Sequence, residues 1–153
     1  GAGTGHDAAG FATLGHRVVA VEPTAALRAG AMALHPSPRI EWVDDLLPDL
    51  HLVRRRGEVF DLVMLTAVWM HLDKRQRRRA MPRVASLLRP GGTMIMSLRY
   101  GPVSAGRRMF AVPAQETIEL AASRGLRPIL NQPAQSVLQS PGVSWRRLAF
   151  LKD

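Results

Sequence analysis

The sequence has no cysteine, only two lysines and no run of 18 apolar residues. Without cysteine there is no disulfide framework and no thiolate metal site, and no spacing of His, Asp and Glu suggests another, so we expect no metal. The lack of a long apolar run argues against a transmembrane helix, and the first residues show neither the basic nor the apolar region of a signal peptide. These absences favour a cytoplasmic protein without a membrane partner.

The sequence is rich in apolar residues and in arginine. Hydrophobic residues fill 46% of the 153 positions, which is typical of one globular domain with its own core. The net charge is +9, and basic residues cluster at 54–56 and 74–79. Such clusters suit RNA or an acidic partner, but neither contains aromatic residues for base stacking. A solvated loop and an exposed helix face are therefore the favoured interpretation.

Strand-like and helical segments alternate along the chain. This alternation predicts a doubly wound α/β domain, in which helices cover both faces of a mostly parallel sheet. Pro82 lies inside the longest expected helix, so we expect a kink or a break there. The expected helices cover residues 7–14, 24–34, 74–88 and 114–124, and the expected strands cover residues 17–22, 40–43, 60–66, 93–98, 126–130 and 145–151.

The chain opens on a glycine-rich turn, with glycine at Gly1, Gly3 and Gly5. Glycine has no Cβ and tolerates positive φ, so the backbone of such a turn can approach a ligand closely. Glu22 follows about 20 residues later, at the end of an apolar run, where its carboxylate can accept both hydroxyls of a ribose. Together the two features predict half of a nucleoside-binding site.

Several polar segments fall at expected strand ends, namely the glycine turn, Glu22, residues 44–45 and residues 66–71. Open α/β sheets bind their ligands at the carboxyl ends of the strands, so we expect these segments to line one crevice. The glycine spacing is Gly-x-Gly-x-Gly and not the Gly-x-Gly-x-x-Gly of nicotinamide dinucleotide folds. A nicotinamide-dependent oxidoreductase is therefore the weakest interpretation.

Motifs in a fixed order extend over nearly the whole chain and resemble those of the class I S-adenosylmethionine-dependent methyltransferases. The glycine turn resembles the first motif, and Val-Glu-Pro-Thr at 21–24 resembles the acidic motif after strand two. Trp-Val-Asp-Asp-Leu-Leu-Pro at 42–48 resembles the segment whose carboxylate contacts the adenine amino group. Residues 60–72 resemble the strand-four motif. Leu-Leu-Arg-Pro-Gly-Gly at 87–92, before strand five, is the most specific of these matches.

The resemblance implies a single Rossmann-like domain over residues 1–153 that binds S-adenosylmethionine and releases S-adenosylhomocysteine. Its final strand would be antiparallel to the others. The three glycines would lie against the methionine and ribose parts of the cofactor, and Glu22, followed by Pro23, would hold the ribose hydroxyls.

The adenine would be received by a carboxylate in the segment after the next strand. Asp45, with Leu46, is the first candidate and Asp44 is the alternative, because the register is open by one residue. A helix cap is the structural alternative for either aspartate. Thr66, after strand four, completes the expected cofactor contacts.

His71, just after strand four, is the candidate general base, because histidine transfers protons near neutral pH. A packing or helix-entry histidine is the slightly favoured interpretation. Trp69 could form a wall of the acceptor pocket or belong to the core. Arg99 and Tyr100, after strand five, are further candidates for contact with the acceptor.

The expected reaction is methyl transfer to an O or N atom of a small-molecule acceptor. Covalent cytosine methylation is excluded without a cysteine nucleophile, and the Asn/Asp-Pro-Pro-aromatic motif of DNA amino-methylation is replaced by Thr-Ala-Val-Trp at 66–69. A catalytically silent binding domain and an RNA-modifying enzyme, the latter supported only by the net charge, are the alternatives. The oligomeric state stays open.

Members of the family carry a strand before the first glycine, central in the sheet order 3-2-1-4-5-7-6. The sequence shows no such strand before Gly1. Backbone groups that lose this neighbour are costly to leave unpaired. We therefore expect this chain to be unstable, or to bind cofactor weakly, unless upstream sequence is restored.

Overall fold

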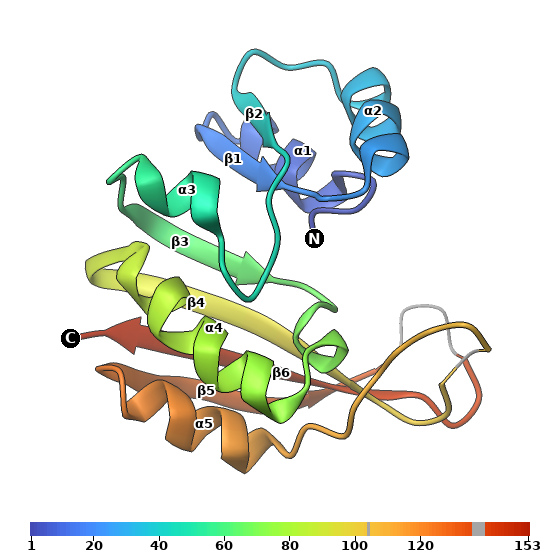
Figure 1. Ribbon diagram of the computed structural model, residues 1–153, viewed down its shortest axis with the longest axis vertical. Helices are drawn as coiled ribbons and strands as arrows, with labels where there is room; N and C mark the ends of the chain where they lie inside the picture. Colours follow the sequence, from blue (N-terminus) through green and yellow to red (C-terminus); the bar gives the residue numbers. More distant parts are fainter. Residues whose placement is uncertain (104, 136–139) are drawn as a thin grey trace. The chain divides into compact units, whose positions relative to one another are not determined.

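The computed structural model describes residues 1–103, 105–135 and 140–153. The chain divides into two compact units (Figure 1). Unit 1 comprises Gly1–Leu46 and Leu50–Gly57, and unit 2 comprises Leu47–Asp49 and Glu58–Asp153. Each unit is described below by itself.

Unit 1 is built on two short parallel strands, β1 (Val18–Val21) and β2 (Ile40–Val43). Their register pairs Val18 with Ile40 and Val21 with Val43. The small apolar core of this unit consists mainly of alanine side chains, which lets α1 pack closely against the strands. The helices of the unit are α1 (His6–Thr13), α2 (Ala25–Leu34) and α3 (His51–Arg55).

Unit 2 contains a four-stranded sheet in the order β3-β4-β6-β5. β3 is parallel to β4, whereas β6 is antiparallel to both β4 and β5. The prediction of a mostly parallel sheet with an antiparallel final strand is thus confirmed, and the fold is Rossmann-like. Its elements are β3 (Phe60–Leu65), η1 (Trp69–His71), α4 (Lys74–Ser86), β4 (Leu88–Tyr100), α5 (Ala114–Ala122), β5 (Leu126–Ala134) and β6 (Ser144–Lys152).

The two observed strand orders match parts of the family order 3-2-1-4-5-7-6. The pair β1-β2 corresponds to strands 2 and 3, and β3-β4-β6-β5 corresponds to strands 4, 5, 7 and 6. Among the described residues β1 pairs only with β2, and β3 pairs only with β4. No described strand therefore has the place of the family's first strand.

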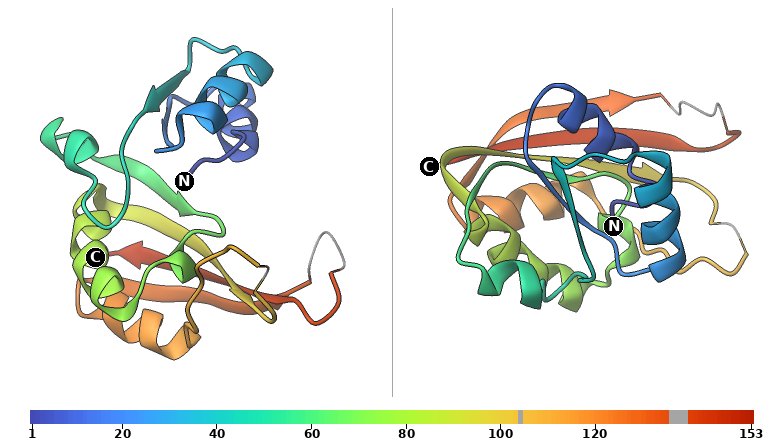
Figure 2. Two further views of the ribbon diagram at one scale, coloured as in Figure 1. Left: turned by 45° about the vertical axis from the view of Figure 1, so that its right-hand side comes forward. Right: turned by 90° about the horizontal axis from the view of Figure 1, so that it is seen from above.

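Helices α4 and α5 lie on the same face of the unit 2 sheet (Figures 1 and 2). Alternate residues of β4 point toward them, so that Met94, Met96 and Leu98 are fully buried. The buried side of α4 includes Met81 and Val84, whereas most of its arginines are exposed. This pattern is the one expected for an amphipathic helix packed on a sheet.

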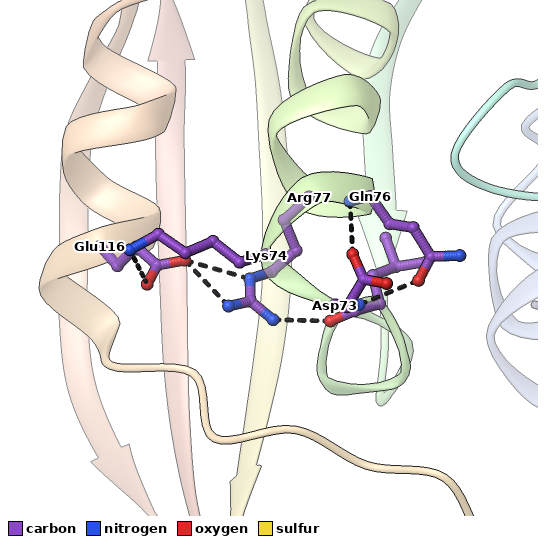
Figure 3. Close-up of polar contacts among 6 residues, drawn as sticks. Asp73, Lys74, Gln76, Arg77 and Glu116 are labelled. Atoms are coloured by element: carbon purple, nitrogen blue, oxygen red, sulfur yellow. Dashed lines mark hydrogen bonds and ion pairs between the residues drawn. The ribbon is translucent and has the colours of Figure 1, made fainter.

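Helix α4 begins at a complete capping box (Figure 3). The Asp73 carboxylate accepts the Gln76 backbone N–H at 2.8 Å, and the Gln76 side chain accepts the Asp73 backbone N–H at 2.9 Å. Asp73 is thus the N-cap of α4. The kink or break expected at Pro82 does not divide the helix, which continues to Ser86. Arg78 is exposed, so water can reach the carbonyl group that Pro82 leaves without a donor.

One arginine of the basic run at 74–79 is not part of a solvated face. Arg77 is only 3% exposed, and its guanidinium donates to one Glu116 oxygen on α5 at 2.9 and 3.2 Å (Figure 3). A third donor reaches the Leu72 carbonyl at 2.6 Å, and Lys74 lies 3.8 Å from the other Glu116 oxygen. This network joins the start of α4 to the first turn of α5.

Three further expectations about local structure are corrected. The basic cluster at 54–56, expected in a loop, lies at the end of α3, and η1 was not expected at all. β4 begins at Leu88 and passes through the expected Pro-Gly-Gly turn, where its register with β3 shifts. β5 continues beyond residue 130 to Ala134, because it pairs with β6 along its length.

Candidate functional site

The glycine turn of unit 1 packs against the end of β1. The Ala2 N–H donates to the Val21 carbonyl at 2.7 Å, and Gly3 and Gly5 have φ values of 57° and 81°. A Cβ on Gly5 would lie 2.7 Å from a ring carbon of Trp42. Glycine is thus required at Gly5 both for its backbone conformation and for close packing.

Glu22, directly after β1, binds the glycine turn. One carboxylate oxygen accepts the Gly3 N–H at 2.8 Å, and the other accepts the Thr24 N–H at 2.9 Å. Burial raises the pKa of Glu22, but the hydrogen bonds from Thr24 and Gly3 outweigh it, so the net pKa lies below its usual value. The carboxylate is ionised at neutral pH, and its donors are the Gly3 N–H and both the N–H and the side chain of Thr24.

Asp45 caps a helix. It is 4% exposed, and its two oxygens accept four backbone N–H groups at 2.7–3.1 Å, from Leu46, His51, Leu52 and Val53. The last three are the first residues of α3. A carboxylate has about four acceptor positions, so none remains for an adenine amino group.

Asp44 has the opposite environment. Its side chain is 63% exposed, and one oxygen accepts from Arg28 at 3.0 Å. Leu46, two residues after Asp44, is 55% exposed and offers an apolar surface. Pro23 is exposed and leads from Glu22 into α2. Of the two aspartates, Asp44 is the one with acceptor capacity to spare.

Arg28 connects the two strand ends and was missed from the sequence. It is the fourth residue of α2, and it donates to the Glu22 carbonyl at 2.6 Å as well as to Asp44. Arg28 lies six residues after Glu22, on the following helix α2. No sequence pattern indicated that its side chain would reach back to the ends of β1 and β2.

In unit 2, the segment after β3 is held in an unusual conformation. Thr66 is exposed, and Ala67 has a left-handed φ of 56°, with its N–H donating to the Ser97 hydroxyl at 2.9 Å. Non-glycine residues with positive φ are uncommon and concentrate at functional sites. Trp69 is fully buried, and its indole N–H has no partner among the described residues, so this side chain belongs to the core.

His71 is exposed and held by one ring nitrogen. Its Nδ1 lies 2.7 Å from the Arg108 carbonyl, and the Phe110 N–H donates to the Met70 carbonyl at 2.8 Å. Because a carbonyl can only accept, the neutral ring carries its hydrogen on Nδ1 and has its lone pair on Nε2. This is the tautomer that a general base requires.

The other two acceptor candidates flank the same loop. Arg99 is half-buried and donates to the Pro102 carbonyl at 2.9 Å, with the Met109 sulfur 3.8 Å away. Burial raises the pKa of Tyr100, and the charge of Arg146 opposes that shift only in part. The loop after β4 thus connects Arg99 to His71 within unit 2.

Within the described ranges there is no group of three or more His, Cys, Asp and Glu that could hold a metal ion. No helix in this part of the chain is long and apolar enough to cross a membrane.

Comparisons with known proteins point to one family. Residues 1–92 match the family model described as a methyltransferase domain, which is more than half of the chain. A search of curated proteins finds no match.

Solved structures show the same fold. The 1,6-didemethyltoxoflavin-N1-methyltransferase of Burkholderia thailandensis, solved with S-adenosylhomocysteine, matches with a TM-score of 0.77 and 24% identity over 99% of this chain and 68% of that one. A TehB-like S-adenosylmethionine-dependent methyltransferase of Corynebacterium glutamicum matches with a TM-score of 0.73 and 22% identity. This match covers 100% of this chain and 77% of that one. The magnesium protoporphyrin IX methyltransferase of Synechocystis, solved with S-adenosylmethionine, matches with a TM-score of 0.77 and 16% identity. This match covers 100% of this chain and 67% of that one.

Proposed function

Because the chain belongs to the methyltransferase domain family, we propose that it transfers a methyl group from S-adenosylmethionine to an O or N atom of a small-molecule acceptor. One observation carries the proposal. An ionised, buried carboxylate at the end of β1 is bonded to the glycine turn, and a second carboxylate with spare acceptor capacity stands at the end of the paired strand β2.

Each carboxylate has a part in cofactor recognition. Glu22 would accept the two ribose hydroxyls with the acceptor positions that Gly3 and Thr24 leave open. Asp44 would accept the adenine amino group, and the exposed Leu46 side chain would cover the ring. Asp45 supports them indirectly, since it fixes the segment between β2 and α3.

The cofactor, when bound, supplies a methyl group on a sulfonium, and its displacement by a lone pair of the acceptor leaves S-adenosylhomocysteine. Such an in-line displacement depends mainly on orientation and on the exclusion of water. An acceptor that arrives as a hydroxyl or an ammonium must also lose a proton. His71 can take this proton at Nε2, because the Arg108 carbonyl holds the hydrogen of the ring at Nδ1.

The neighbours in structure support a small acceptor. The Burkholderia enzyme was solved with 1,6-didemethyltoxoflavin, and the Synechocystis enzyme is named for magnesium protoporphyrin IX. Arg99, whose guanidinium lies 3.8 Å from the Met109 sulfur in the loop after β4, would contact the acceptor. Thr66, which precedes the left-handed Ala67, would contact the cofactor.

Calorimetric titration of S-adenosylhomocysteine into the chain tests the proposal. In line with the expectation from the sequence, we expect weak but saturable binding to the unaltered protein, and at least a tenfold further loss in Glu22→Gln, which is about 1.4 kcal/mol. Arg39→Gln is the matched control, because Arg39 donates to the Gly15 carbonyl in the same unit and has no proposed contact with the cofactor. A folded chain that fails to bind S-adenosylhomocysteine would contradict the proposal.

Release of S-adenosylhomocysteine from S-adenosylmethionine, measured against a panel of small hydroxyl and amine compounds, then tests the transfer itself. We expect turnover with at least one of them and a lower rate in His71→Ala with unchanged cofactor affinity. Cofactor binding without any turnover would instead favour a catalytically silent binding domain.

A further inference from the structure

Arg28 contacts both residues that carry the proposed cofactor carboxylates, Glu22 after β1 and Asp44 after β2. The ends of β1 and β2 are joined by a hydrogen bond of 3.1 Å from the N–H of Glu22, directly after β1, to the carbonyl of Val43, the last residue of β2. The Arg28 guanidinium adds a second connection, with one nitrogen 2.6 Å from the Glu22 carbonyl and the other 3.0 Å from an Asp44 oxygen. One side chain thus fixes Asp44 relative to Glu22.

The two partners of this ion pair differ in exposure. The Arg28 side chain is 19% exposed, whereas the Asp44 side chain is 63% exposed. Apart from Arg28, no hydrogen bond or ion pair to the Asp44 carboxylate was found in the described residues. Without the guanidinium, this carboxylate could rotate into water at little cost.

An ion pair of this exposure contributes little to folding, because solvent screens it and both side chains lose rotational freedom. Its contribution to geometry is larger. The guanidinium is planar and presents its nitrogens in a fixed fork, so two contacts define the position of the group. Arg28 occupies one Asp44 oxygen and leaves the other to accept a hydrogen bond in a defined direction.

A held carboxylate discriminates between purines. An ionised carboxylate only accepts hydrogen bonds, so it favours the 6-amino group of adenine and repels a 6-oxo group. A carboxylate that is free to rotate can turn away from a 6-oxo group and so avoid the repulsion. Such a carboxylate also binds the 6-amino group of adenine less tightly, because its side chain must be ordered on binding. Sites that bind a polar group in this way gain most of their specificity from rejection of the analogue that lacks it.

We propose that Arg28 is the positioning residue for adenine recognition: by holding Asp44 at the end of β2, it makes the cofactor site select 6-amino over 6-oxo purine nucleosides. The proposal rests on the proposed function. It assigns to Arg28 no contact with the cofactor itself.

Calorimetry with two ligands, S-adenosylhomocysteine and its 6-oxo analogue S-inosylhomocysteine, tests the proposal. We expect Arg28→Met to weaken binding of the adenosyl ligand about tenfold, the effect of one side chain that must be ordered on binding. Binding of the inosyl ligand should stay within about twofold, so that the ratio of the two dissociation constants falls. A general loss of structure would weaken both ligands alike and leave the ratio unchanged.

Arg56→Met is the matched control. Arg56 pairs with Glu41 on β2 in the same unit and is 25% exposed, close to the value for Arg28. We expect both affinities to be unchanged in this variant. Arg28→Lys, which keeps the charge and one donor group, should show an intermediate ratio even if the methionine variant folds poorly.

The possible outcomes separate the two proposals. An unchanged ratio in Arg28→Met and Arg28→Lys, with binding to the unaltered protein intact, would overturn the role of Arg28 and leave the proposed function standing. Absence of S-adenosylhomocysteine binding in the unaltered, folded protein would overturn the proposed function and the role of Arg28 with it.

Discussion

Asp45 offers the sharpest test of how two adjacent aspartates divide their roles. Asp45→Ala removes an acceptor for four backbone N–H groups, three of which belong to the first turn of α3. The consequences differ along that turn. Leu52 is 48% exposed, so water can replace the lost acceptor there, whereas Val53 is 2% exposed and its N–H stays without a partner.

The expected cost follows from these contacts. Loss of a helix cap costs about 1–2 kcal/mol, and a buried donor left unsatisfied costs about 1–3 kcal/mol. Since part of the two effects is the same hydrogen bond, we expect Asp45→Ala to reduce the free energy of unfolding by about 3 kcal/mol. For a chain of this size that corresponds to a fall in Tm of roughly 6–12 °C.

Thermal and urea unfolding followed by circular dichroism would measure this loss. Asp44→Asn is the matched variant, because the exposed neighbour should change the free energy of unfolding by no more than about 0.5 kcal/mol while it weakens binding of S-adenosylhomocysteine. The reasoning is refuted if Asp44→Asn is the destabilising change, or if Asp45→Asn weakens binding with an unaltered Tm.

Three other changes have defined outcomes. Gly5→Ala places a Cβ 2.7 Å from Trp42 at a φ of 81°, and should cost about 2 kcal/mol in urea unfolding. Arg77→Met leaves the Glu116 carboxylate without its main partner, and should cost about 3 kcal/mol in the same assay. The pKa of Glu22 is lowered in the folded state, so its contribution to stability is present above about pH 4.5 and is lost as the pH falls below that value. Glu22→Gln should remove this part of the pH dependence.

Neighbouring residues provide the controls for these changes. Gly10→Ala on α1 adds a Cβ that meets no atom within 4 Å, so this variant should be as stable as the unaltered protein or more stable. If Gly10→Ala lost as much free energy of unfolding as Gly5→Ala, the steric explanation would be excluded. Arg78→Met alters an exposed side chain next to Arg77 and should have little effect. A Glu22→Gln variant with the acid sensitivity of the unaltered protein would show that other carboxylates control it.

The fold was largely predictable because local signals and tertiary structure agree. The segment at 60–66 was expected to be a strand and forms β3, and the helix expected at 74–88 forms as α4, which begins at Lys74. The uninterrupted course of α4 through Pro82, where a kink or a break was expected, shows the limit of local rules. A lost backbone hydrogen bond breaks a helix only where neither packing nor water compensates for it.

The basic run at 74–79 contained a signal that a charge count ignores. Arg77, Met81 and Val84 follow one another at helical spacings of four and three residues, so the arginine lies on the buried face. Helical periodicity could have indicated its burial, although the arginines of this helix were expected on the exposed face. The sequence could not identify Glu116, 39 residues away, as its partner.

The roles of Asp44 and Asp45 could not be read from the sequence. Both follow β2 directly, and a shift of one residue exchanges an exposed carboxylate with a buried one. The choice depends on where α3 turns back, since the first N–H groups of that helix gather around Asp45. Arg28 was equally hidden, because its contacts join three segments that only the folded chain brings together.

A crystal structure of the chain with S-adenosylhomocysteine tests the central claim most directly. The account expects the ribose hydroxyls on the Glu22 carboxylate, the adenine 6-amino group on Asp44, and Arg28 still bonded to Asp44. Asp45 should keep its four backbone hydrogen bonds. Adenine bound to Asp45, or ribose bound away from Glu22, would contradict the account.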